Sequence, residues 1–212
     1  MRLPIKIPTP LLLVLLPLLG LSQCIGLNEE PAPALPMPAA TQTGANTAGC
    51  RVDGQLWVAE RTYLLFGPQG PPVTAKWDNA STGGPHLLLY FEKQLSDEAR
   101  LHYDTDLTLK IPGITGPGTF ALDRTPNPNL WLGNVPHAVF TFNKPSSRRT
   151  HLTGPQTPGR LVVTRLDTVA RIVSGTFEFT AAEGTSGLTG NGTPVPGGKT
   201  VRVTDGRFDC KF

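Results

Sequence analysis

Residues 106–111 read Asp-Leu-Thr-Leu-Lys-Ile, and this stretch decides the fold class. Apolar and polar side chains alternate without a break, so one face of the segment is apolar and the other is polar. A period of two with one polar face is typical of a half-buried antiparallel strand, not of a helix. The stretch therefore predicts an all-β protein.

The same alternation, or a short apolar run, recurs along the chain between clusters of turn-forming residues. The chain has 23 Gly and 22 Pro among 212 residues, which argues against long helices. We therefore expect an antiparallel β-sandwich of about nine or ten short strands, with a closed lipocalin-like barrel as the alternative. One or two helical turns are expected at residues 96–101. The other expected strands are 52–59, 73–78, 87–91, 119–122, 139–142, 160–166, 176–180 and 201–210.

The C-terminal segment allows two interpretations. Asp205-Gly206 lies between alternating residues, which is a strong hairpin signal and would pair Val203 with Phe208. The competing interpretation is a single final strand with a bulge at Gly206.

The N-terminus resembles a bacterial export signal. Arg2 and Lys6 precede an apolar run at residues 11–19, which is too short to span a bilayer as a helix. The following Leu21-Ser22-Gln23-Cys24 has the layout of a lipoprotein signal, although Gln23 departs from the small residue expected before the cysteine. We expect residues 1–23 to be a signal peptide and Cys24 to carry lipid. Ordinary cleavage after Ser22 and an uncleaved membrane anchor are the alternatives.

This signal predicts the location and the organisation of the chain. A lipidated Cys24 would attach the protein to the membranes of a bacterial cell envelope, on the periplasmic or the surface face of the outer membrane. Residues 24–49 alternate Pro with small residues and cannot bury enough apolar surface to order themselves, so they are expected to form a flexible tether. Residues 50–212 are expected to form a single β domain.

The charge of the chain argues against a nucleic-acid partner. The formal net charge is +3, from 19 basic and 16 acidic residues. Removing Arg2 and Lys6 with the signal leaves 17 basic against 16 acidic residues, or +1. The densest basic spot, Arg148-Arg149, is expected in a solvated loop, and a nucleic-acid partner requires a larger basic face.

Exported thiols tend to form disulfides. With Cys24 assigned to lipid, Cys50 and Cys210 remain as an even pair near the two ends of the domain. We expect a Cys50–Cys210 disulfide, with two free buried thiols as the alternative.

The sequence contains little that indicates catalysis, a metal site or a cofactor. His86, His102, His137 and His151 are not spaced as a local ligand pair, so they are interpreted as surface or loop residues. No Ser lies in a Gly-x-Ser-x-Gly elbow, and Ser174 is interpreted as a packing residue beside Gly175.

Two kinds of residue remain as candidates for a site. Trp57 and Trp77 lie in expected strands and are assigned to the core, whereas the loop residue Trp131 is the best candidate for a binding role. Carboxylates such as Asp104, Asp106 or Glu178 are the candidates for an envelope hydrolase.

Two motifs carry a resemblance to a known family. Residues 171–179, Arg-Ile-Val-Ser-Gly-Thr-Phe-Glu-Phe, and residues 203–209, Val-Thr-Asp-Gly-Arg-Phe-Asp, resemble the ending of a family of uncharacterised Bacteroidota lipoproteins. Residues 50–57 resemble the first strand of that family. The resemblance implies a β-rich exported domain and carries no catalytic residues.

The expected function is a non-enzymatic binding or interaction domain for a glycan or protein ligand, attached to the membrane through lipid. A carboxylate-based hydrolase and a barrel that carries a small apolar ligand are the alternatives.

Overall fold

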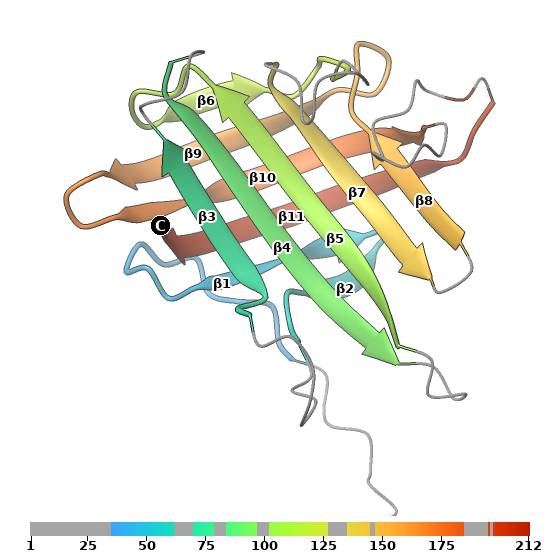
Figure 1. The fold of residues 1–212 in the computed structure, drawn as a ribbon, viewed down its shortest axis with the longest axis horizontal. Coiled ribbons are helices and arrows are strands. Elements are labelled where there is room, and N and C mark those ends of the chain that lie inside the picture. The colour runs from blue at the N-terminus through green and yellow to red at the C-terminus, as the bar shows by residue number, and fades with distance from the viewer. Residues whose placement is uncertain are drawn as a thin grey trace, which may run out of the picture. The chain divides into compact units, whose positions relative to one another are not determined.

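The computed structural model describes residues 35–61, 70–78, 84–96, 102–126, 135–144, 147–184, 195 and 197–212. The described ranges contain strands and no helix, so the all-β prediction is confirmed (Figure 1). The strands are β1 (Thr47–Val52), β2 (Gln55–Val58), β3 (Val73–Asp78), β4 (His86–Ser96), β5 (His102–Pro112), β6 (Gly118–Ala121), β7 (His137–Lys144), β8 (Ser147–Leu152), β9 (Gly159–Asp167), β10 (Ile172–Glu183) and β11 (Thr200–Lys211).

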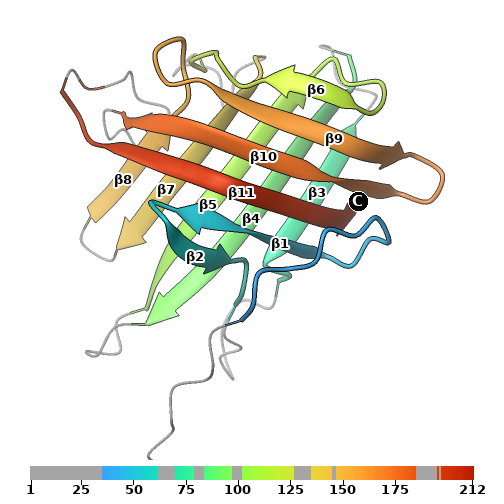
Figure 2. The same cartoon turned by 180° about the vertical axis from the view of Figure 1, so that it is seen from behind.

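The strands form one antiparallel sheet that folds over into two layers. The order along the sheet is β2-β1-β11-β10-β8-β7-β5-β4-β3, and β9 pairs with β10 on one side and with β6 on the other. Strands β3, β4, β5, β7 and β8 form one layer, and β6, β9, β10 and β11 cross behind them with β1 and β2 (Figures 1 and 2). The architecture is thus a curled half-barrel, between the sandwich and the closed barrel expected from the sequence.

The two layers are joined at two places. At one corner, β8 pairs with β10 through Leu152–Ala182 and His151–Glu183. At the other, the chain leaving β2 crosses to the opposite layer, where the Glu60 amide donates to the Glu92 carbonyl 3.0 Å away. The Gln94 amide in turn donates to the Glu60 carbonyl at 2.9 Å. These backbone bonds hold the layers around a common core.

Aromatic rings from both layers fill the space between them. The ring of Phe91 on β4 lies 6.0 Å from that of Phe177 on β10 and 6.1 Å from that of Phe208 on β11. Trp57 on β2 meets Phe140 on β7 edge-on at 6.3 Å. Each fully buried side chain of this size contributes roughly 1.5–3 kcal/mol to folding, so the core is the main stabilising element of the described domain.

Glycine lies directly opposite a core phenylalanine in two cross-strand pairs. Gly206 on β11 faces Phe177, and Gly175 on β10 faces Phe208. A Cβ at Gly206 would lie 2.4 Å from the Phe177 ring, and one at Gly175 would lie 2.9 Å from the Phe208 ring. The large and small residues of the C-terminal motifs are therefore complementary parts of the core.

The C-terminal segment is one strand with a bulge, so the hairpin interpretation is wrong. Strand β11 runs without interruption from Thr200 to Lys211. Its register against β10 shifts where Thr204 and Asp205 together oppose Glu178. Asp205 has a φ of 56°, a left-handed conformation that occurs in one class of bulge. The bulge locally bends the outer face of the sheet.

The compact domain includes residues from Leu35 onward, within the stretch that was predicted to be tether. Residues 35–46, which we expected to belong to the tether, form an arm that lies against the sheet beside β1 and the end of β11 (Figure 2). The Arg207 guanidinium donates to the Pro38 carbonyl at 3.3 Å, and the Lys211 amide donates to the Asn46 side chain at 2.8 Å. Residues 47–49 of the predicted tether belong to β1, and residues 1–34 lie outside the described ranges.

Asp209 holds this arm in place. Its carboxylate accepts hydrogen bonds from Thr41 Oγ1 at 2.6 Å, the Thr43 amide at 2.9 Å, the Gly44 amide at 2.8 Å and the Ala45 amide at 3.1 Å. The residue is fully buried. Burial alone would raise the pKa of the carboxyl, but these donors outweigh it and hold the pKa well below its usual range. Asp209 is therefore a buried charge satisfied by the arm.

The structure contradicts the predicted Cys50–Cys210 disulfide, because both thiols are free and buried. The first and last strands do pair, as the prediction required, but their register separates the cysteines. On either side of Cys50, Gly49 lies opposite Arg207 and Arg51 lies opposite Thr204. Cys210 lies about four residues further along β11, roughly 13 Å at the rise of a strand. A disulfide requires Cα atoms within about 7 Å.

Other local expectations also differ from the structure. Arg148 and Arg149 lie in β8 and not in a loop. Ser96 ends β4, and the rest of the expected helical turn, 97–101, lies outside the described ranges. Across those ranges, no helix has the length and hydropathy that a membrane crossing requires.

Candidate functional site

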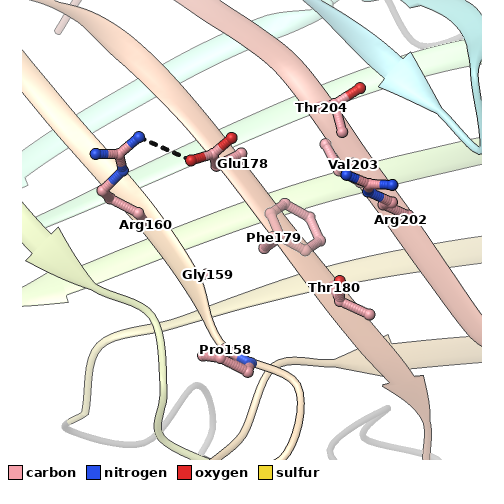
Figure 3. A pocket seen from close by; sticks show the side chains of 9 residues that line it. All are labelled: Pro158, Gly159, Arg160, Glu178, Phe179, Thr180, Arg202, Val203 and Thr204. Atoms are coloured by element: carbon pink, nitrogen blue, oxygen red, sulfur yellow. Dashed lines mark hydrogen bonds and ion pairs between the residues drawn. The ribbon is translucent and has the colours of Figure 1, made fainter.

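The outer face of β9, β10 and β11 carries two adjoining hollows. The first has a volume of about 310 Å³ and is lined by Arg160, Glu178, Thr180, Arg202 and Thr204, among others (Figure 3). The second, of about 350 Å³, shares Arg160 and Glu178 with the first. The alternation of the strands produces this arrangement: Phe179 and Val203 point into the core, so their neighbours along the strand point outward.

One ion pair spans this face. Arg160 Nη2 lies 2.8 Å from Glu178 Oε1, and the two side chains are 59% and 54% exposed. At such exposure an ion pair is stabilising by no more than about 1 kcal/mol, so it can exchange with other partners. Arg202, on the far side of β10, is also exposed. In the described ranges, no carboxylate pairs with its guanidinium.

A second polar cluster lies on the outer face of the other layer. The Tyr90 hydroxyl is 2.9 Å from Asp106 Oδ1 and 3.3 Å from Glu92 Oε2. Asn143 Nδ2 donates to Asp106 Oδ2 at 2.5 Å. Arg61 donates two hydrogen bonds to the Glu92 carboxylate, from Nη2 to Oε2 and from Nε to Oε1, the latter at 3.0 Å. Burial, the largest influence, raises the pKa of Asp106 against the two hydrogen bonds.

This cluster joins the layers and leaves little room for a substrate. Arg61 follows the crossing at Glu60, so its bond to Glu92 attaches that crossing to β4. Two catalytic carboxylates must leave space between them for a reacting bond. The Tyr90 hydroxyl occupies the space between Glu92 and Asp106. The geometry therefore favours a structural network.

The residues that the sequence suggested for a site lie far apart or outside the described ranges. Asp104 and Asp106 lie on β5, whereas Glu178 lies on β10 in the other layer. Cys24 and Trp131 lie outside the described ranges. Trp57 is 5% exposed and belongs to the core, and Trp77 packs against it, so both predictions of core packing are confirmed.

Two histidines interpreted as surface or loop residues are buried in strands. His137 begins β7 and is fully buried, and His151 in β8 is 3% exposed. Nδ1 of His137 lies 2.7 Å from the Val135 carbonyl, and Nε2 has no hydrogen-bond partner in the described part of the chain. Burial lowers the pKa of His137 to about 4. The imidazole is therefore held neutral.

This burial predicts a loss of stability in acid. Because the folded pKa of His137 lies near 4 and the unfolded pKa near 6.5, the unfolded chain takes up the proton first as the pH falls. The free energy of unfolding should be highest above pH 6.5 and fall by about 3 kcal/mol by pH 4. Urea unfolding across this pH range measures the change. In His137→Asn, which keeps a donor for Val135, the slope should shrink; an unchanged slope would contradict the assignment.

Arg160 and Arg202 were not predicted to share a surface. Residues 160–166 were predicted only as a strand, and in the structure Arg160 and Thr164 are exposed while Leu161 and Val163 are buried. The alternation was present and would have placed Arg160 on an outer face. The pairing of β9, β10 and β11 that brings Arg160 near Glu178 is set by register, which short motifs do not specify.

Burial also makes the thiols of Cys50 and Cys210 poor candidates for chemistry. Burial raises the pKa of the Cys50 thiol to about 12, and it raises the pKa of Cys210 as well.

No family profile, curated protein or solved structure matches this chain. No group of three or more His, Cys, Asp or Glu in the described ranges could hold a metal ion. The hollows on the outer face of β9, β10 and β11 are therefore the best-supported candidate site.

Proposed function

We propose that this chain is an exported, lipid-anchored protein of the bacterial cell envelope whose β domain binds a ligand and does not catalyse a reaction. The observation that carries the binding role is the pair of hollows over β9, β10 and β11, where exposed arginine, glutamate and threonine side chains gather. The core between the layers is filled by aromatic rings, which favours recognition on an outer face over enclosure of an apolar ligand. Anchoring rests on the signal that ends at Cys24.

The rival function, a carboxylate-based hydrolase, has less support. Its strongest candidate, the pair Glu92 and Asp106, is bridged by the Tyr90 hydroxyl and bonded to Arg61 and Asn143. Asp106 and Glu178 lie in different layers and cannot act together. Binding is therefore the function that the geometry supports best.

One experiment in cells tests both parts of the proposal. The full chain is produced in a bacterium that lipidates proteins, with a photo-reactive amino acid at Thr180 in the hollow, and the cells receive a clickable fatty acid. We expect fatty-acid label, recovery with membranes, and an ultraviolet-dependent adduct with an envelope component. Cys24→Ser should lose the label and the membrane association, whereas Cys50→Ala should keep both.

The outcomes separate the two parts. Label that persists in Cys24→Ser would contradict lipidation at that residue. A reactive group at Thr108, on the outer face of the other layer, serves as the control for position. Adducts of equal yield at Thr180 and Thr108, or none at Thr180, would contradict a binding role for the hollow.

A further inference from the structure

We infer that the first hollow binds an acidic glycan, with Arg160 and Arg202 contacting two of its carboxylates. This inference rests on the proposed binding function and specifies its ligand. The two guanidinium groups lie on either side of β10, with Glu178 and Thr180 between them (Figure 3).

The charges of the hollow favour an anionic ligand. Glu178, which pairs with Arg160, is the single carboxylate among the residues that line the first hollow with Arg160 and Arg202. Asp205 lines the adjoining hollow and pairs with Arg51, and Asp53 accepts from the backbone amide of Arg202. Within the described ranges, the Arg202 guanidinium lacks an acidic partner. A ligand carboxylate can therefore pair with Arg202 directly and can displace Glu178 from Arg160. Guanidinium groups suit this task because their planar donors match a carboxylate.

The backbone around the hollow favours recognition by side chains. Strand β10 is paired with β9 and β11, β9 also with β6, and β11 also with β1. An extended peptide usually binds a sheet by adding a strand at an open edge, and the hollow lies over strands that have neighbours on both sides. The groups available to a ligand are guanidinium and hydroxyl groups, from Arg160, Arg202, Thr180 and Thr204. These suit the carboxylates and hydroxyls of an acidic sugar.

Among the described residues that line the hollows, no aromatic ring is exposed, which favours an acidic sugar over a neutral one. A neutral sugar commonly stacks its apolar face on an exposed aromatic ring. The rings nearest the hollows, Phe177 and Phe179, are each 3% exposed because they point into the core. Binding here must therefore depend on charge and hydrogen bonds.

The spacing of the two arginines favours a ligand with more than one sugar unit. Arg160 pairs with Glu178 across β9 and β10, and Arg202 pairs with Thr180 across β10 and β11. Two strand spacings separate the arginines laterally, about 10 Å. Because the two guanidinium groups lie on either side of β10, a ligand that pairs with both in these positions should carry at least two carboxylates (Figure 3).

Calorimetric titration of the full chain tests the inference. The probes are an oligogalacturonate, its neutral methyl ester, galacturonate monomer and a polyglutamate peptide. We expect the oligogalacturonate to bind, with an affinity that falls as salt is added, and the methyl ester and the monomer to bind far more weakly. Arg160→Gln and Arg202→Gln should each weaken binding roughly five-fold, the loss of one exposed charge contact.

Removal of the competing carboxylate provides the sharpest test. Glu178→Gln should strengthen binding, because Arg160 is then free for the ligand. Glu60→Gln removes a carboxylate in the other layer, where Glu60 pairs with Lys93 at 3.1 Å. Glu60→Gln and Lys93→Gln are therefore the charge controls, and both should leave the affinity unchanged.

Three results would overturn the inference. The first is an absence of oligogalacturonate binding, and the second is binding that Arg160→Gln and Arg202→Gln leave intact. The third is polyglutamate binding of equal strength with the same dependence on the two arginines, which would point to an acidic peptide. The proposed function has a separate readout, because adduct formation from Thr180 in cells requires no particular ligand.

Discussion

Replacement of Asp209 by asparagine is expected to lower the free energy of unfolding by about 3–5 kcal/mol, the effect of disrupting a buried, hydrogen-bonded charge. The carboxylate oxygens accept from Thr41, Thr43, Gly44 and Ala45 in the arm, and from Ser174 Oγ at 2.7 Å. Asparagine offers one acceptor oxygen and an amide group that would face donors. Several buried donors would then lose their partners, each at a cost of about 1–3 kcal/mol.

Urea unfolding of the full chain at neutral pH measures this loss, and hydrogen exchange at residues 41–45 locates it. Ser174→Ala is the matched control, because it removes one donor and keeps the charge; it should cost about 1 kcal/mol. A midpoint for Asp209→Asn equal to that of the unmodified chain would show that the arm is not held by this carboxylate.

Replacement of Gly175 by alanine is expected to lower the free energy of unfolding by about 3 kcal/mol, at the upper end of the usual cost of overpacking. The added Cβ would lie 2.0 Å from the Val162 carbonyl oxygen and 2.9 Å from the Phe208 ring. The carbonyl belongs to the neighbouring strand β9, so relief requires a movement of the backbone. The core around Phe208 and Phe91 would be displaced with it.

Gly116→Ala is the matched control for this substitution. A Cβ at Gly116 meets no atom within 4 Å, and its φ is not in the left-handed region. Thermal unfolding followed by circular dichroism should show a clear decrease in melting temperature for Gly175→Ala and almost none for Gly116→Ala. Equal melting temperatures in the two variants would refute the proposed clash.

The sequence predicted the strands well because alternation is a local property. Residues 106–111 alternate because β5 has the core on one face and an outer face on the other, and β5 indeed covers them. Strand β8 was not predicted, because Arg148 and Arg149 are exposed and the buried residues of this strand lie only in its second half. Polar residues at a strand end look like a loop until the partner strand is known.

Features that depend on register could not be predicted. The sequence placed Cys50 and Cys210 at the two ends of the domain, and β1 and β11 are indeed neighbours. The offset between them follows from which residues face each other, and the bulge near Asp205 alters that register. The same holds for the hollow, because Arg160 and Arg202 come together only through the pairing of three strands.

The arm sets an upper limit on how far an anchored domain can move from the membrane. If Cys24 carries lipid, ten residues separate it from Leu35, where the described domain begins. Fully extended, the chain from Cys24 to Leu35 spans at most about 40 Å, whereas the chain from Cys24 to Cys50 would span about 90 Å. By binding residues 41–45, Asp209 would then more than halve the largest distance that an anchored domain can reach, and would restrict its search for ligands to a thin layer above the lipid surface.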